Sequence, residues 1–297
     1  MNALQAMHER FMNCPRFVAA VVLIILLAPV NRTLGAGNTF AWRSLSPGLE
    51  LKLLALQMPN SPGDARITVL RIDPKLWELQ LVGTGLSGED RGHTAREWCE
   101  REKFTAAINA GMFGADQKTH LGYARLREHV YNSRVNAYQS VAAFDPQDPQ
   151  AHPRFHIFDL DAPEVRFENI QRDYASLVQN LRLVKRSGQN QWSQQVRKWS
   201  EAALGEDEMG RILFIFSRSP LSMHDLNREL LSGSIGLVAA QHLEGGPEAQ
   251  LYLHVGETEL ETFGSFETSF REDDNNSAAW PVPNVLGIRP RSFAPPN

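Results

Sequence analysis

Two segments of the sequence end an apolar run with polar side chains and glycine. Residues 105–113 read TAAINAGMF, and residues 235–246 read IGLVAAQHLEGG. Each pattern predicts a buried strand whose backbone becomes irregular at its end. Enzymes often place their chemistry at such strand ends, where a rigid scaffold meets a loop. The two strand ends are therefore the first candidates for a functional site.

The second segment combines a histidine, a carboxylate and two glycines. His242 and Glu244 lie two positions apart, so in a regular strand their side chains share one face. Gly245 and Gly246 leave room for a ligand to approach the backbone, whose N–H groups suit an anionic oxygen. The segment therefore predicts a paired polar wall, formed by His242 and Glu244.

The first segment adds an amide. The Asn109 side chain both donates and accepts hydrogen bonds, which suits a sugar hydroxyl or a phosphate oxygen. Gly111 follows two positions later. The alternative interpretation of Asn109 and the glycines is a tight turn capped by an amide, because glycine turns are common in sheet proteins.

Together the two segments resemble the phosphodiester glycosidase family. Members usually carry Asn-(Gly/Ala)-Gly-x-Phe in the first segment, where this chain has NAGMF at 109–113. In the second they carry Leu-Asp-Gly-Gly, where this chain has LEGG at 243–246. The resemblance extends over roughly residues 100–290.

The resemblance implies hydrolysis of a sugar-1-phosphodiester at the anomeric carbon, with the phosphate left on the other partner. Ordinary glycosidases need two carboxyl groups, but a phosphodiester departs as a stable anion, so one carboxylate can suffice. The resemblance implies that Glu244 is this carboxylate, which activates water or stabilises an oxocarbenium-like centre. The implied ligand is a carbohydrate or glycosyl phosphate. The implied catalytic residues are Glu244, Asn109 and His242, and the implied substrate-binding residues are Gly111, Arg218, Gly245 and Gly246.

Arg218 is the residue expected to hold the phosphate. It follows the apolar run 211–217, where many family members carry an arginine. A guanidinium matches a phosphate with two parallel hydrogen bonds. Arg125 and Arg182 are weaker candidates, and the alternative for each is a solvated arginine.

Several departures from the family pattern favour a shared fold over a shared activity. Glu244 stands where the family has Asp, Pro247 stands where Ser or Thr is common, and EAALG at 201–205 lacks the usual arginine. Two functions therefore stay open. One is an exported hydrolase acting on a glycosyl phosphodiester or a related surface glycan. The other is a non-catalytic relative that binds an envelope polysaccharide or supports its assembly.

The composition is that of a globular protein. The 297 residues are 42% hydrophobic and 22% charged, with a net charge of -4 and no basic run, which argues against nucleic acid as a partner. The glycines at 83–88 continue into a loop, and Pro153 separates His152 from His156. No cofactor and no metal site are therefore expected.

The N-terminus predicts export. Arg10 and Arg16 precede the apolar run 17–30, which is short for a membrane span and typical of a signal-peptide core. Residues 1–36 are expected to be a signal peptide or, alternatively, an uncleaved anchor that supplies the protein's only contact with a membrane. The expected location is periplasmic or extracellular.

Residues 40–290 are expected to form a single main domain of the α+β class, a mixed, largely antiparallel sheet flanked by helices. The strand ends at Ala110 and Leu243 are expected to lie side by side. The residue patterns predict strands at 49–58, 65–73, 76–82, 179–184, 211–217 and 235–243, a strand at 250–255 beside the last of these, and helices at 94–103, 192–204 and 222–232.

Overall fold

The computed structural model describes residues 41–57, 62–84 and 91–292. The chain divides after Gly37, and all described residues belong to the part that follows. The expected signal peptide or anchor at 1–36 lies outside the described residues. Among the helices that are described, none is long and apolar enough to cross a membrane.

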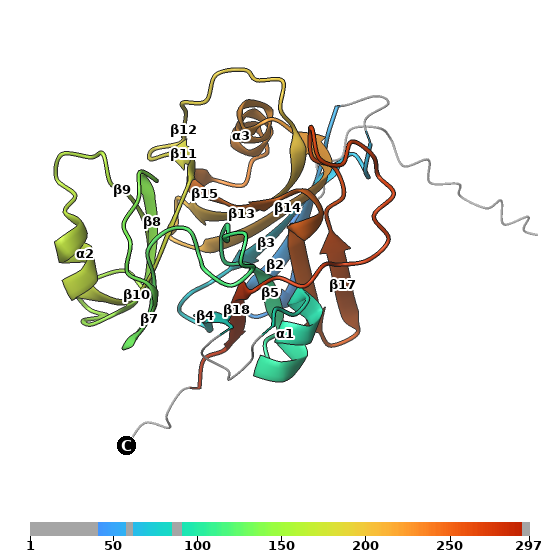
Figure 1. Ribbon diagram of the computed structural model, residues 1–297. Helices are drawn as coiled ribbons and strands as arrows, with labels where there is room; N and C mark the ends of the chain where they lie inside the picture. The colour runs from blue at the N-terminus through green and yellow to red at the C-terminus, as the bar shows by residue number, and fades with distance from the viewer. Residues whose placement is uncertain (1–40, 58–61, 85–90, 293–297) are drawn as a thin grey trace, which may run out of the picture. The chain divides into compact units, whose positions relative to one another are not determined.

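The described strands form three sheets, and neighbouring strands are antiparallel in each (Figure 1). The largest has eight strands in the order β1 (Arg43–Ser46), β2 (Leu49–Ala55), β3 (Arg66–Ile72), β14 (Ile212–Leu221), β13 (Trp199–Asp207), β15 (Leu237–Gly245), β11 (Arg182–Lys185) and β12 (Gln189–Asn190). The second has the order β17 (Thr258–Phe263), β16 (Gln250–Val255), β5 (Ala106–Asn109), β18 (Asn284–Pro290) and β4 (Trp77–Gly83). The third has the order β7 (His129–Asn132), β6 (Ala124–Leu126), β10 (Tyr174–Asn180), β8 (Ser140–Pro146) and β9 (Phe155–Asp159).

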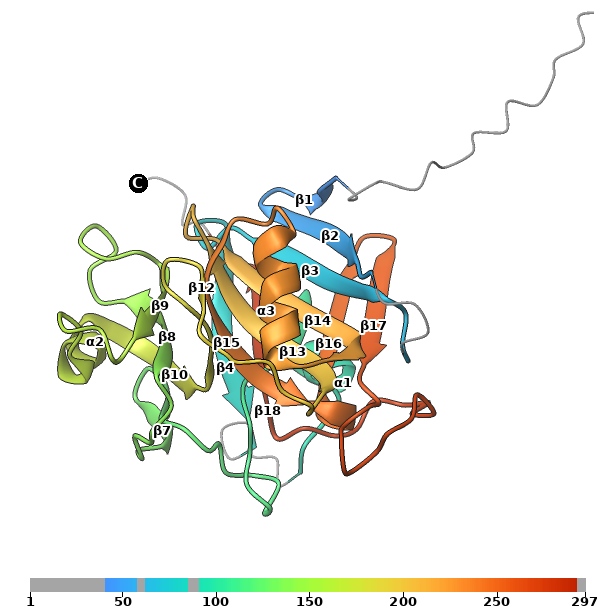
Figure 2. The same ribbon diagram turned by 90° about the horizontal axis from the view of Figure 1, so that it is seen from above.

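The main core lies between the first two sheets. Leu70 and Phe214 from the eight-stranded sheet are buried in the same cluster as Ile108 and Leu286 from the second sheet. Helix α3 (Met223–Ser232) packs on the other face of the eight-stranded sheet (Figure 2). Helix α1 (Ala95–Glu102) packs on the other face of the second sheet, and α2 (Phe167–Asp173) packs on the third (Figure 1).

The expected fold class is corrected in part. The largely antiparallel pairing is confirmed, but the protein is mainly β and has three sheets instead of one mixed sheet flanked by helices. The predicted helix at 192–204 is wrong, because residues 199–207 form β13. Its Ala202, Ala203 and Leu204 are fully buried between β14 and β15. Sheet hydrogen bonds on both sides there override the helix propensity of an alanine-leucine run.

Two further predictions concern which strands pair. The predicted strand at 179–184 is instead the junction between β10, in the third sheet, and β11, in the first. The strand at 250–255 exists as β16, but it pairs with β5 and β17 and not with β15. Pairing depends on tertiary contacts, which a local residue pattern does not contain.

The helices at 94–103 and 222–232 are confirmed with their caps. The Thr94 hydroxyl accepts a hydrogen bond from Glu97 N, and the Glu97 carboxylate accepts one from Thr94 N. Ser222 caps α3 by accepting from Asp225 N at 3.1 Å and donating to its carboxylate at 2.7 Å. Both caps satisfy amide groups that the first helical turn leaves without partners.

Replacing Ser222 by alanine should therefore lower the free energy of unfolding by about 1 kcal/mol, because the cap is lost and the helix start becomes unsatisfied. Urea denaturation measures this change. Ser193→Ala, which alters an exposed serine between β12 and β13, is the matched control and should leave stability unchanged. Equal stability of the two variants would show that the cap contributes nothing.

Candidate active site

The end of β15 carries the residues singled out by the sequence. His242 lies opposite Ala203 and Glu244 opposite Ala202, because the register of β13 and β15 shifts between these two pairs. Leu243 is thus an extra residue on β15, and strict alternation of side chains is interrupted here. Such bulges redirect side chains and are frequent beside active sites.

His242 forms a buried pair with Glu201 of β13. Its Nδ1 lies 2.5 Å from Glu201 Oε1, and both residues are buried. Trp199 Nε1 donates to the other carboxylate oxygen at 2.5 Å. Burial alone lowers the pKa of His242, but the charge and hydrogen bond of Glu201, with Glu244 and Glu267 nearby, raise it above its usual value. The imidazolium form of His242 is therefore favoured.

Glu244 lies beside this pair. The residue keeps some contact with solvent, while protein atoms surround its carboxyl group. This burial raises the pKa of Glu244 to about 8, against the opposing effects of His242 and of the Gly245 N–H, which donates to Glu244 Oε1 at 3.0 Å. The charges of Glu248 and Glu201 add to the rise. At neutral pH Glu244 therefore holds a proton.

Two more glutamates complete the acidic cluster. Glu248 ends the short 3-10 helix η1 (Gly246–Glu248), and Glu267 comes from the loop after β17. Burial raises the pKa of each, and the charge of Glu267 further raises that of Glu248. A Cβ at Gly246 would lie 2.6 Å from Glu267 Oε2, so this position needs glycine to admit the carboxylate. We name Glu201, His242, Glu244, Glu248 and Glu267 the glutamate cluster.

Asn109 joins β5 to the turn after β15. Its Nδ2 donates to Glu248 O at 2.9 Å, and its Oδ1 accepts from Gln250 N at 2.7 Å. The strands that end near Ala110 and Leu243 are not neighbours in one sheet. Asn109 links β5 to the segment that follows β15, through the backbone of residues 248 and 250. Both ends of its amide are occupied by backbone, which matches the interpretation of a capped turn.

Gly111 packs against two buried polar side chains. A Cβ at this position would collide with Asn180 Oδ1 and His120 Nε2. Asn180 Nδ2 donates to Ala110 O at 2.9 Å, and the next residue, Leu181, accepts from His242 N at 2.8 Å. Gly111 therefore connects the first segment to the glutamate cluster through β10 and its junction with β11.

Comparison with known proteins places these segments in a family. The phosphodiester glycosidase family model matches residues 102–289, which include Asn109, His242, Glu244 and the loop of Glu267. The chain belongs to the phosphodiester glycosidase family. The resemblance predicted from the two sequence segments is thereby confirmed.

Solved structures support the same fold. The catalytic domain of zebrafish N-acetylglucosamine-1-phosphodiester alpha-N-acetylglucosaminidase, auto-inhibited by its pro-peptide, is similar with a TM-score of 0.57 and 14% identity, covering 84% of this chain and 86% of that one. A hypothetical protein from Synechocystis is similar with a TM-score of 0.54 and 12% identity, covering 83% of this chain and 63% of that one. At these identities the likeness establishes a common fold. No curated protein matches the sequence significantly.

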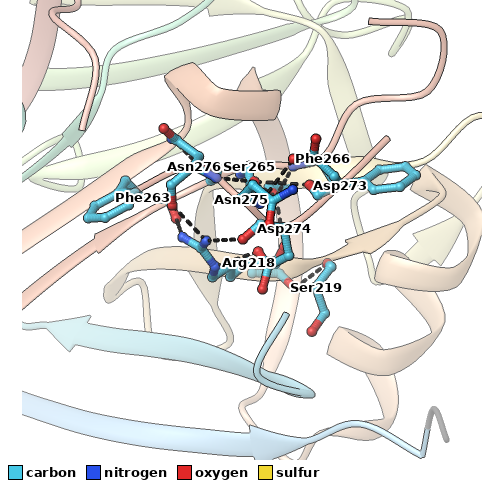
Figure 3. A network of polar contacts seen from close by, with 12 residues as sticks. Arg218, Ser219, Phe263, Ser265, Phe266, Asp273, Asp274, Asn275 and Asn276 are labelled. Atoms are coloured by element: carbon cyan, nitrogen blue, oxygen red, sulfur yellow. Dashed lines mark hydrogen bonds and ion pairs between the residues drawn. The ribbon is translucent and has the colours of Figure 1, made fainter. Parts of the chain in front are cut away.

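The three arginines considered for phosphate binding all bind other groups of the protein. Arg218 hydrogen-bonds Asp274 and the carbonyls of Phe263 and Asn276 (Figure 3). Arg125 donates to carbonyls of residues 171, 174 and 175, and Arg182 binds Asp159, Asp161 and Gln191. The glutamate cluster has Arg197 nearby instead, whose charge, with that of His242, partly offsets the rise that burial causes in the pKa of Glu267.

A cavity of about 300 Å³ has Leu181 and Trp192 in its lining. None of the five cluster residues lines it, and its link to them is the backbone of Leu181, whose carbonyl accepts a hydrogen bond from His242 N. Ala137 and Gln139, on either side of Tyr138 in the sequence, also line the cavity. Burial and the charge of Glu244 raise the pKa of Tyr138. Among the described residues, no group of three or more His, Cys, Asp or Glu has the arrangement of a metal site.

Sequence reasoning missed Glu201, Glu267 and Trp199. In the sequence, Glu201 is the first residue of the EAALG segment, which drew attention only because it lacks the family's usual arginine. Glu267 lies in a loop that contains no recognisable motif. No local pattern links residues 201, 242 and 267, because antiparallel pairing and a loop bring them together. The one usable signal was the run of small residues that follows Glu201 within the same strand, β13.

Gly111→Ala should destabilise the protein by about 1–3 kcal/mol, because the new methyl group overlaps Asn180 and His120, which are buried and have little room to move. Thermal unfolding checks the change. Gly114→Ala is the matched control, since its nearest neighbour is an exposed Asp116 oxygen at 3.2 Å. Equal losses in the two variants would refute the special packing of Gly111.

Glu244→Gln should become stabilising relative to the native protein as pH rises. An unfolded glutamate ionises near its model value of 4.5, whereas folded Glu244 ionises near 8. The stability contributed by its retained proton is full below the first value and is lost as pH rises through the second. Glutamine has no such loss, so the difference should grow to about 1–3 kcal/mol at pH 8.

Urea unfolding at pH 5, 6.5 and 8 measures this difference. Glu257→Gln, in the exposed turn between β16 and β17, is the control and should show no trend. Parallel stability curves for the native protein and Glu244→Gln would mean that the pKa of Glu244 is not raised.

Proposed function

We propose that this member of the phosphodiester glycosidase family is an exported hydrolase that cleaves a glycosyl phosphodiester at the anomeric carbon. The observation that carries the proposal is the position of Glu244, a proton-holding carboxyl group at the family's second motif, beside the buried pair of His242 and Glu201. A structural relative is named for N-acetylglucosamine-1-phosphodiester, so diesters of that sugar are the first substrates to test.

The reaction breaks the bond between the anomeric carbon and the phosphate oxygen. Because its pKa is raised to about 8, Glu244 acts first as an acid and not as the carboxylate that the family resemblance implies. It donates its proton to a phosphate oxygen as that bond breaks, and the positive His242 stabilises the remaining phosphate charge. Water then adds to the anomeric carbon and gives a proton to the Glu244 carboxylate. The products are a free reducing sugar and a phosphate monoester, and Glu244 is protonated again.

The raised pKa values suit an anionic substrate. Ionised Glu244, Glu248 and Glu267 would repel a phosphodiester, whereas their protonated forms donate hydrogen bonds to it. Burial raises the pKa of all three carboxyl groups, and that of Glu244 reaches about 8. We therefore assign substrate binding to protonated Glu244, to His242 and to the backbone of Gly245 and Gly246, and we assign Asn109 and Gly111 to holding the two segments together.

A non-catalytic carbohydrate-binding protein is the second candidate. One observation favours it, namely that Asn109 uses both ends of its amide within the fold. The same cavity beside Trp192 could then hold a glycan without turnover.

Glu244→Gln should lower kcat about 10²- to 10⁴-fold with little change in KM, because glutamine keeps the shape but transfers no proton. In the native protein, kcat should fall as pH rises through about 8, where Glu244 loses its proton. This descending limb should be absent from the residual activity of the variant. Release of reducing sugar from N-acetylglucosamine-1-phosphodiesters measures both effects.

Glu257→Gln serves as the control and should keep native turnover. Undiminished hydrolysis by Glu244→Gln would remove Glu244 from the chemistry. Absence of hydrolysis in every version, with glycan binding retained, would establish the carbohydrate-binding alternative. Export is tested separately by fractionation, in which cytoplasmic full-length protein would contradict it.

A further inference from the structure

The loop of residues 264–276 brings Glu267 to the glutamate cluster. It follows β17, and its first residue, Gly264, donates from its N–H to Ala249 O at 2.8 Å. Glu267 lies in a turn in which its N–H donates to Arg271 O at 2.7 Å. The next N–H, of Thr268, donates to Lys198 O at 3.0 Å. The position of the Glu267 carboxyl group beside Gly246 therefore depends on the conformation of this loop.

Arg218 binds both ends of the same loop (Figure 3). Its Nη1 donates to Phe263 O at 2.8 Å, just before the loop begins. Its Nε donates to Asp274 Oδ1 at 2.7 Å, and its Nη2 donates to Asp274 O at 3.2 Å and to Asn276 O at 2.9 Å, where the loop ends. One guanidinium on β14 thus joins the two ends of the loop at its base.

Two buried serines continue this network into the loop. Ser200 Oγ donates to Arg218 O at 2.7 Å and accepts from Ser265 N at 3.0 Å and Phe266 N at 3.2 Å. Ser265 Oγ donates to Asp273 O at 2.9 Å and accepts from Asn276 N at 3.1 Å. The backbone on either side of Glu267 is therefore tied to β13 and β14.

We propose that Arg218 is a positioning residue, which closes the base of loop 264–276 and so holds Glu267 against the Gly246 turn in the active site. It acts through Glu267 and does not contact the substrate. Its effect on turnover rests on the proposed function, whereas its effect on the loop does not.

The choice of arginine follows from the geometry. The planar guanidinium of Arg218 donates four hydrogen bonds, one to the residue before the loop and three to residues near its end. Lysine presents a single compact charge on a flexible stem and cannot reproduce this fork. Because these donors already have partners, Arg218 cannot also offer a bidentate contact to phosphate without releasing the loop.

The test replaces Arg218 by glutamine and by lysine in the full chain. Arg218→Gln should raise amide hydrogen exchange in 264–276 at least about tenfold while leaving exchange within β14 unchanged. The carbon-13 titration of the Glu267 carboxyl group, which lies near His242, Arg197 and Glu248, should move toward that of a solvated glutamate. The kcat/KM for the phosphodiester should fall about 100-fold, as expected for a misplaced active-site group. Arg218→Lys should recover part of each change.

Arg228→Gln is the matched control, because Arg228 also pairs with carboxylates but lies exposed on α3. It should alter none of the three measurements. If Arg218→Gln does not fold, Asp274→Ala removes the ion pair at an exposed residue and should produce the same changes in weaker form.

Native exchange and native titration of Glu267 in a folded Arg218 variant would overturn the proposal. If the native protein hydrolyses no phosphodiester, the proposed function fails, while exchange and titration still decide the role of Arg218.

Discussion

A histidine and a glutamate face each other 2.5 Å apart in the buried space where β13 and β15 meet, and the candidate site is arranged around them. Two buried charges are stable only when they are close and hydrogen-bonded, so this pair constrains both strands. The indole N–H of Trp199 donates to the second carboxylate oxygen of Glu201, and the backbone N–H of His242 donates to Leu181 O. These contacts favour the positively charged form of His242, which is fixed in position among the acidic side chains of the site.

The fold supplies the other groups from separate sheets. Asn109, in the second sheet, binds the backbone on both sides of Ala249, and Asn180, in the third, binds the backbone beside Gly111. Each link is a hydrogen bond from a buried amide to backbone, so neither residue needs to change its conformation to maintain the site. Three sheets that share no strand pairing thus meet at one place, and a single small change such as a methyl group on Gly111 disturbs the contact between them.

The acidic character of the site limits the conditions under which it can accept an anion. Burial opposes ionisation of Glu244, Glu248 and Glu267, and their mutual repulsion opposes it further. A site of this kind favours anionic ligands at lower pH, where its carboxyl groups are donors. The same burial reduces folding stability at higher pH, so the chemistry proposed for the site and the pH dependence of stability have one physical cause.

The sequence by itself determined the family, most strands, two capped helices and the position of Glu244. These depend on short patterns, namely an apolar run, a cap three residues from its partner, or glycines after a strand, and such patterns act locally. Tertiary structure decided the sheet to which each strand belongs, the strand at 199–207 in place of a helix, and the partnership of Glu201 with His242. It also decided that the Arg218 guanidinium is bound to loop residues and is not free to bind a phosphate. These features arise from residues far apart in the chain, whose contacts depend on strand pairing and burial and leave no periodic pattern in the sequence.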